Sequence, residues 1–64
     1  MAWIEHEGAL INLDKITYIK RYKESEISFF GPGEIDYTRL SFSDTEAADK
    51  ALQAIRKLLY PLKV

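Results

Sequence analysis

Hydrophobic and polar residues alternate in short runs through most of the chain, and the pattern then changes to a helical period. Runs in which every second side chain is apolar, with turn-forming residues between them, are typical of β-strands. The pattern predicts strands at residues 3–6, 9–12, 16–23, 27–30 and 35–42. Apolar residues spaced three and four apart then predict one helix.

Turn-forming residues separate the predicted strands. Glu7 and Gly8 predict a two-residue hairpin, because glycine supplies the positive φ that such turns need. Asn12 and Asp14 flank a predicted corner, where their side chains can accept hydrogen bonds from nearby backbone amides. Residues 31–34, Gly-Pro-Gly-Glu, fit a type II turn with proline second and glycine third.

The helix is predicted over residues 44–59, followed by a tail at 60–64. Ser43, with Glu46 three residues later, has the spacing of a capping box at the N-terminus. Pro61 is expected to end the helix, because the residue before a proline avoids helical geometry. One apolar stripe runs along it and consists of Ala48, Ala51, Leu52, Ile55, Leu58 and Leu59.

These elements predict a single α+β domain over residues 1–64, with all strands within 2–42. We expect an antiparallel meander of about five strands, with the C-terminal amphipathic helix packed on one face.

Strand pairing then sorts the side chains onto two faces. In the turn at residues 23–26, a two-residue loop at 24–25 or a four-residue loop at 23–26 would pair Tyr22 with Ile27, whereas an odd loop length would exchange the faces. Across the next turn, Ser28 is expected to pair with Tyr37 and Glu26 with Arg39. The helix is expected on the face that carries Ile16, Tyr18, Tyr22, Ile27, Phe29, Leu40 and Phe42.

The opposite face is predicted to carry Ile19, Phe30, Ile35 and Tyr37, which one helix cannot also cover. A contiguous exposed apolar patch usually marks an interface, so we interpret these four residues as a candidate interface. The prediction is a homo-oligomer, with a dimer favoured, joined through this face or an edge strand. In the alternative, the first two strands, with Trp3, fold over this face.

Composition limits the class of protein. The chain has 64 residues, 47% hydrophobic, with a formal net charge of −1 and no cysteine. It is too apolar and too weakly charged for a disordered chain, and it can form neither disulfides nor cysteine-based metal sites. No apolar run approaches the roughly 18 residues of a membrane span, and no signal-peptide pattern begins the chain. We therefore expect a cytoplasmic protein that does not enter membranes.

Candidate catalytic chemistry is sparse. His6 stands between Glu5 and Glu7, but on a strand the two glutamates point away from the histidine, so we expect His6 to be solvent-exposed and not a metal ligand. The glycines at 31 and 33 lack the lysine and helix start of a phosphate-binding loop. The sequence predicts no catalytic residue, no metal site and no cofactor, and therefore a non-enzymatic interaction module.

A single-stranded nucleic-acid-binding domain is the alternative function. Its candidate contacts are Lys20, Arg21, Tyr22, Lys23 and Arg39, which combine cations for phosphates with an aromatic ring for base stacking. Nearby glutamates and the net negative charge favour the protein-interaction hypothesis, because nucleic-acid affinity depends on accumulated positive charge.

Residues 8–16, Gly-Ala-Leu-Ile-Asn-Leu-Asp-Lys-Ile, resemble a strand-corner-strand pattern found in small bacterial proteins of unassigned function. The resemblance implies a small bacterial domain and assigns no active residue. The order of strands followed by a helix also resembles a reduced pleckstrin-like or Whirly-like unit, a likeness of architecture that does not establish function.

Overall fold

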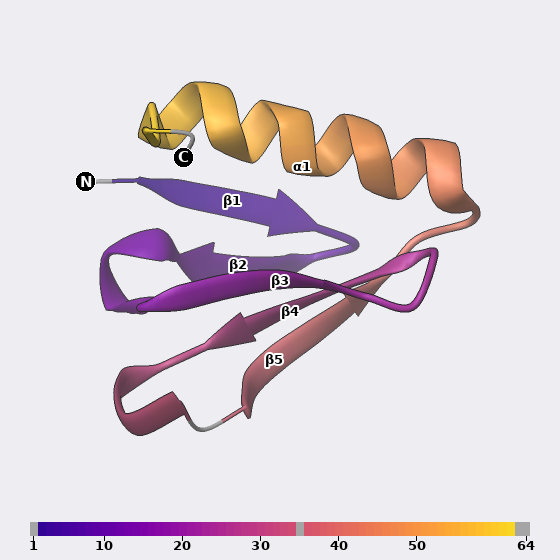
Figure 1. Cartoon of the computed structure of the whole chain (residues 1–64). Coiled ribbons are helices and arrows are strands. Elements are labelled where there is room, and N and C mark those ends of the chain that lie inside the picture. The colour runs from indigo at the N-terminus through magenta and orange to yellow at the C-terminus, as the bar shows by residue number, and fades with distance from the viewer. Residues whose placement is uncertain (1, 35, 63–64) are drawn as a thin grey trace.

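The computed structural model describes residues 2–34 and 36–62, and at positions 34, 36 and 37 the backbone alone. Its elements, in chain order, are β1 (Trp3–His6), β2 (Ala9–Asn12), β3 (Tyr18–Tyr22), β4 (Glu26–Phe30), β5 (Asp36–Ser41) and α1 (Thr45–Leu59) (Figure 1). The strands form two antiparallel sheets, a β1-β2 hairpin and a β3-β4-β5 sheet. The predicted α+β class, with antiparallel strands and one C-terminal helix, is confirmed.

A short 3-10 turn at Leu13–Lys15 separates the two sheets, so the strands do not form one continuous meander. Asn12 caps this turn, since its side-chain oxygen accepts a hydrogen bond from the Asp14 amide at 2.9 Å. The predicted corner is therefore confirmed. Leu13 is buried in the core at this corner. The chain changes direction there, so β3 does not pair with β2.

Two predicted turns have the expected backbone. Glu7 and Gly8 both have positive φ, 50° and 86°, as a two-residue type I′ hairpin requires. Gly33 has φ 81° and ψ 10°, the geometry of the third position of a type II turn. A register irregularity between Phe29 and Phe30 precedes this turn, in the pairing of β4 with β5.

The predicted register between β3 and β4 is wrong by one residue. Tyr22 lies opposite Glu26 and not Ile27, because the loop at residues 23–25 has an odd length. Lys23 begins this loop with φ 57°, a left-handed conformation that the sequence does not signal. A shift of one residue exchanges the two faces of β3, so Ile19 faces the helix and Tyr18 and Tyr22 face away from it.

The register between β4 and β5 differs from the prediction by two residues. Ser28 lies opposite Arg39, and Ile27 opposite Leu40. The expected pairs of Ser28 with Tyr37 and Glu26 with Arg39 are therefore wrong. Because side chains alternate with a period of two, Leu40 still shares the helix-facing side with Ile27, as predicted.

The core forms between the β3-β4-β5 sheet on one side and the hairpin and helix on the other. Its buried cluster combines side chains from all of these elements and consists of Ile11, Leu13, Ile27, Phe29, Leu40 and Ile55. The hairpin therefore packs on the same side of the sheet as α1, contrary to the alternative in which it covers the opposite face. We call the side of the sheet away from this core the outer face.

The helix begins at Thr45, and both its first residue and its N-cap lie one residue later than predicted. The Asp44 side chain, and not that of Ser43, accepts a hydrogen bond from the Ala47 amide at 2.8 Å. At the other end, Tyr60 adopts the left-handed conformation with φ 50°, and its amide donates to the Arg56 carbonyl at 2.8 Å. Pro61 follows at once, which agrees with the predicted end of the helix.

Candidate interaction surfaces

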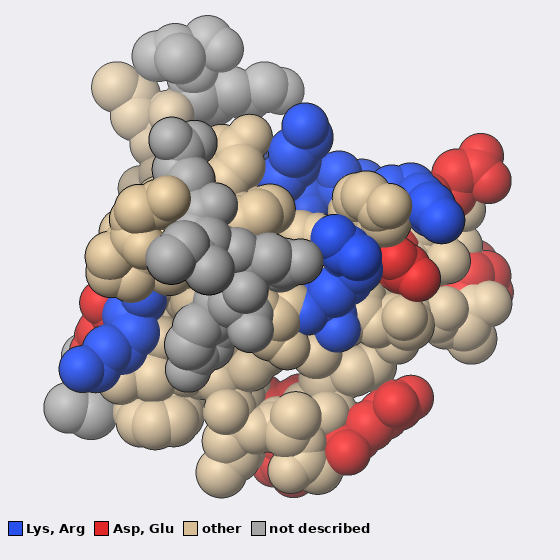
Figure 2. Space-filling view, turned by 90° about the horizontal axis from the view of Figure 1, so that it is seen from below, with Lys and Arg blue, Asp and Glu red and all other residues tan. Residues whose placement is uncertain are grey.

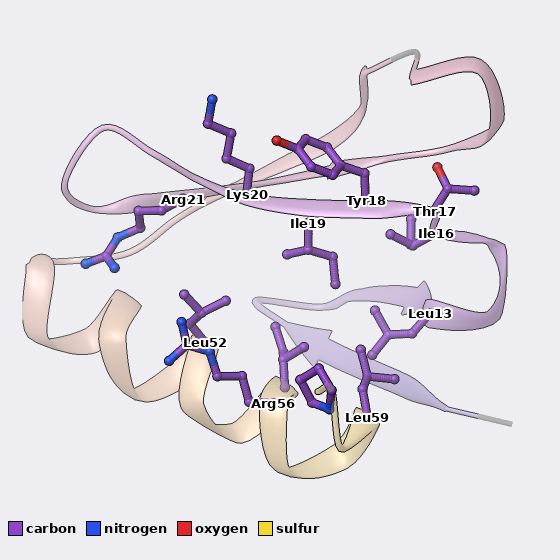
Figure 3. Close-up of a pocket in the computed structure, with 12 residues that line it drawn as sticks. Leu13, Ile16, Thr17, Tyr18, Ile19, Lys20, Arg21, Leu52, Arg56 and Leu59 are labelled. Atoms are coloured by element: carbon purple, nitrogen blue, oxygen red, sulfur yellow. The ribbon is translucent and has the colours of Figure 1, made fainter. Parts of the chain in front are cut away.

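An open apolar groove lies between β3 and the C-terminal half of α1 (Figure 3). Its volume is about 510 Å³. Ile19 points into it from β3, and Leu52 and Leu59 point toward it from α1. The remaining apolar lining is Leu13, Ile16, Ile55 and Pro61. We call this feature the β3–α1 groove.

The groove remains open because β3 supplies little apolar cover. Ile19 is the one aliphatic side chain of the strand, and it lies between the polar neighbours Tyr18 and Lys20, which point to the outer face (Figure 3). On the helix side, Leu59 is still 44% exposed. The sheet and helix therefore diverge along this side of the molecule.

The groove has a cationic rim. Lys20, Arg21 and Arg56 border it, and no carboxylate is among its lining residues in the described part of the chain. Arg21 is tied to the helix, because its guanidinium lies 2.6 Å from the Asp49 carboxylate and also donates to the Thr45 carbonyl at 3.4 Å. Lys20 and Arg56 are exposed and form no ion pair with any residue that the structure describes.

A second apolar surface lies at the C-terminal end of α1. Leu58 is 46% exposed, and Tyr60 and Leu62 are both 88% exposed. We call Leu58, Leu59, Tyr60 and Leu62 the helix-end patch. The start of β1, where Trp3 is 52% exposed, lies at the same end of the molecule (Figure 1).

The outer face of the sheet is aromatic and cationic. The Arg39 guanidinium lies 3.8 Å from the centre of the Tyr22 ring, and its Nε donates to the hydroxyl of the buried Ser28 at 3.1 Å. The Tyr18 and Phe30 rings pack at 5.4 Å. Figure 2, seen from this side, shows Lys and Arg side chains near the middle of the face and at one edge, and Asp and Glu side chains around its margins.

The structure separates the predicted interface residues. Ile19 lies on the helix-facing side and lines the groove, so its predicted grouping with Phe30 is wrong, for the reason of register given above. Phe30 lies on the outer face and is half-buried. Ile35 and the side chain of Tyr37 lie outside the described residues.

The five candidate nucleic-acid contacts are also divided. Lys20, Tyr22 and Arg39 share the outer face, but Arg21 faces the helix. Lys23 lies in the turn, with its Nζ 5.3 Å from the Tyr22 ring centre. Two cations therefore approach the Tyr22 ring, and they compete with any base that would stack on it.

His6 is half-buried, which corrects the expectation that it is solvent-exposed. Its ring packs against Phe42 with centroids 4.4 Å apart, and its Nε2 lies 2.9 Å from the Ser41 carbonyl oxygen. A carbonyl can only accept, so Nε2 carries the proton and donates. His6 thereby joins β1 to the end of β5.

Among residues 2–34 and 36–62, no three His, Cys, Asp or Glu side chains are grouped as metal ligands. No helix in this part of the chain is long and apolar enough to cross a bilayer. Comparisons with protein-family models, with curated proteins and with solved structures gave no match.

Sequence reasoning missed the groove because it assigned Leu52 and Leu59 to a covered helix face. The sequence held one signal of the correct register. Ile19 and Ile27 are both aliphatic, and placing them on the same face of the sheet requires a loop of odd length between β3 and β4. The tyrosines of β3 then fall on the outer face, where amphipathic rings tolerate water. No pattern in the sequence indicated that Arg56 would lie at the rim of the groove.

Proposed function

We propose that the protein is a non-enzymatic interaction module that self-associates through its helix-end patch. The observation that carries the proposal is the exposure of consecutive large side chains in and after the last helical turn. Exposed large apolar side chains concentrated at one end of a molecule are a common mark of an interface. Small domains also gain stability from association, since their own cores bury little area.

The helix-end patch supports this role better than the outer face does. Tyr18, Tyr22 and Phe30 of the outer face are aromatic and contact one another or cations, whereas Leu58 and Leu62 extend aliphatic groups into water. Burial of a large aliphatic side chain contributes about 1.5–3 kcal/mol. Two copies packed helix end to helix end would bury each such residue twice, because a two-fold interface uses the same patch on both copies.

The test is solution mass measured over a range of protein concentrations. We expect the mass to rise from that of one chain to that of two, and Leu58→Glu to raise the midpoint concentration by about tenfold or more. Leu10→Glu is the matched control, since Leu10 is 65% exposed but lies on β2. A monomer at every concentration, or equal effects of both variants, would reject the helix-end patch as the interface.

Trp3 offers a second readout in the same samples. It is the one tryptophan of the chain and the first residue of β1, which begins at the end of the molecule where α1 ends (Figure 1). Association through this end would move its fluorescence emission to shorter wavelength as concentration rises. An unchanged spectrum across the mass transition would place the interface elsewhere.

Binding of single-stranded nucleic acid to the outer face is a second candidate function. It is favoured by one observation, the shared face of Lys20, Tyr22 and Arg39. A fluorescent single-stranded oligonucleotide tests it at low salt, where phosphate contacts are strongest. Lys20→Glu should then abolish the affinity while Lys50→Glu on the helix retains it, and the absence of any binding by the native protein rejects this candidate.

A further inference from the structure

The strand β3 lies at an edge of its sheet. The order of the larger sheet is β3-β4-β5, and β2 pairs with β1. Within the described chain, β3 therefore has one partner strand, and alternate backbone N–H and C=O groups along its other side point away from β4. Such an edge is a template for an additional strand.

This edge runs beside the β3–α1 groove. Ile19 belongs to the edge strand and also lines the groove, with Leu52 and Leu59 on the opposite wall. A strand added to β3 would lie about 4.8 Å from it and would direct every second side chain to each face. One set of its side chains would enter the groove, and the other set would lie beside Lys20 on the outer face.

The charge of β3 identifies the kind of strand that fits. A second copy of β3 would bring Lys20 and Arg21 against the same cations, and like charges placed opposite each other destabilise a sheet. A lysine on an edge strand is itself a common device against such self-pairing. Carboxylates on the outer-face side of the added strand, by contrast, would lie beside Lys20, and no carboxylate is among the described lining residues of the groove.

We propose that the β3 edge and the β3–α1 groove together bind an extended segment of a different protein in which apolar and acidic side chains alternate. The segment adds to the sheet beside β3. Its apolar side chains occupy the groove over Ile19 and Leu52, and its acidic side chains lie next to Lys20. This goes beyond the proposed self-association, which uses the helix-end patch and shares only Leu59 with the groove among the described residues.

The probe is a fluorescent, end-capped hexapeptide of alternating valine and glutamate, titrated into the native protein. One comparison peptide alternates valine and lysine. Two further peptides are glutamate peptides with N-methyl groups on alternate amides, in the two possible registers, so that each lacks the donors on one edge. Fluorescence anisotropy should show saturable binding of the glutamate peptide. The lysine peptide should bind about tenfold more weakly or not at all. The peptide methylated on its docking edge should not bind, because strand addition depends on main-chain hydrogen bonds.

Two variants of the protein test where the peptide binds. Lys20→Glu should weaken binding of the glutamate peptide by about tenfold and strengthen that of the lysine peptide. Lys50→Glu makes the same change of charge on the helix and should alter neither, since Lys50 does not line the groove.

Four results would overturn the inference: no binding at about 1 mM peptide, equal binding of the two charged peptides, full binding by both N-methylated registers, or indifference to Lys20→Glu. Solution mass is measured in parallel without peptide. Self-association can therefore fail while peptide binding succeeds, or the reverse, and the two outcomes are read separately.

Discussion

The neighbouring strands β3 and β4 have the same length and pair residue for residue, but they differ in burial. In β4, Ile27, Ser28 and Phe29 are all buried, whereas no residue of β3 is. The central residues of the two strands, Lys20 and Ser28, are cross-strand partners, and one is exposed while the other is buried. β4 has a strand on each side and the hairpin and helix above it, and β3 has a strand on one side and a groove on the other. Position in the sheet therefore determines which strand forms the core and which remains open to a partner.

The largest expected effect comes from truncating the centre of the core. Phe29→Ala should reduce the free energy of unfolding by about 3–5 kcal/mol, because its side chain is fully buried. A domain of this length has a total stability of only about 3–10 kcal/mol, so the variant should be largely unfolded. Urea unfolding followed by Trp3 fluorescence measures the loss.

Phe30→Ala is the matched control on the outer face of the same strand. Phe30 is half-buried against Tyr18, and we expect a loss of about 1–2 kcal/mol. Equal losses for the two phenylalanines would mean that the outer face of the sheet is as well covered as the inner face.

A smaller effect is expected at the start of the helix that covers β4. Asp44→Ala removes the side-chain acceptor for the Ala47 amide and should cost about 1 kcal/mol of stability. Ser43→Ala removes the side chain that the sequence pattern favoured as the cap and should change the stability by less than about 0.5 kcal/mol. A larger loss of stability for Ser43→Ala than for Asp44→Ala would show that Ser43 is the N-cap, as the capping-box pattern predicted.

The loop that joins β3 to β4 should tolerate glycine at one position only. Lys23 has φ 57°, so Lys23→Gly should relieve strain and raise the stability by about 0.5–1 kcal/mol. Glu24→Gly, at the next residue, should lower it, because Glu24 is not among the residues with positive φ and glycine adds entropy to the unfolded chain. Thermal unfolding of both variants compares the two effects, and stabilisation at Glu24 would contradict the loop geometry.

The smallest effect is expected from the ion pair between β3 and α1. Arg21 and Asp49 are 2.6 Å apart, but their side chains are 28% and 51% exposed. A double-mutant cycle with Arg21→Gln and Asp49→Asn should give a coupling of about 0.2–1 kcal/mol that decreases at high salt. A coupling that does not respond to salt would mean that the pair is shielded from solvent.

The sequence predicts the parts of this fold that are determined locally. The hairpin at Gly8, the type II turn at Gly33 and the end of the helix before Pro61 each depend on the conformations open to one or two residues, and each was predicted. The register of β3 depends on the left-handed backbone of Lys23, a residue type that rarely adopts it. One unpredicted φ angle therefore moved Ile19 to the opposite face.

The candidate surfaces were less predictable than the fold. The exposure of Leu59 and the opening of the β3–α1 groove depend on how far the helix lies from an edge strand, which no local pattern encodes. The choice between Ser43 and Asp44 as the cap was similarly open, because both side chains can accept a hydrogen bond from a backbone amide.

Amide hydrogen exchange, measured residue by residue at a concentration where the protein is monomeric, tests the open edge of β3 most directly. We expect the amides of β4 to exchange only through global unfolding, and those of alternate β3 residues that point away from β4 to exchange far faster. Protection along the whole of β3 equal to that of β4, in the monomer and without any peptide, would show that the edge is already covered and would contradict its availability to a partner.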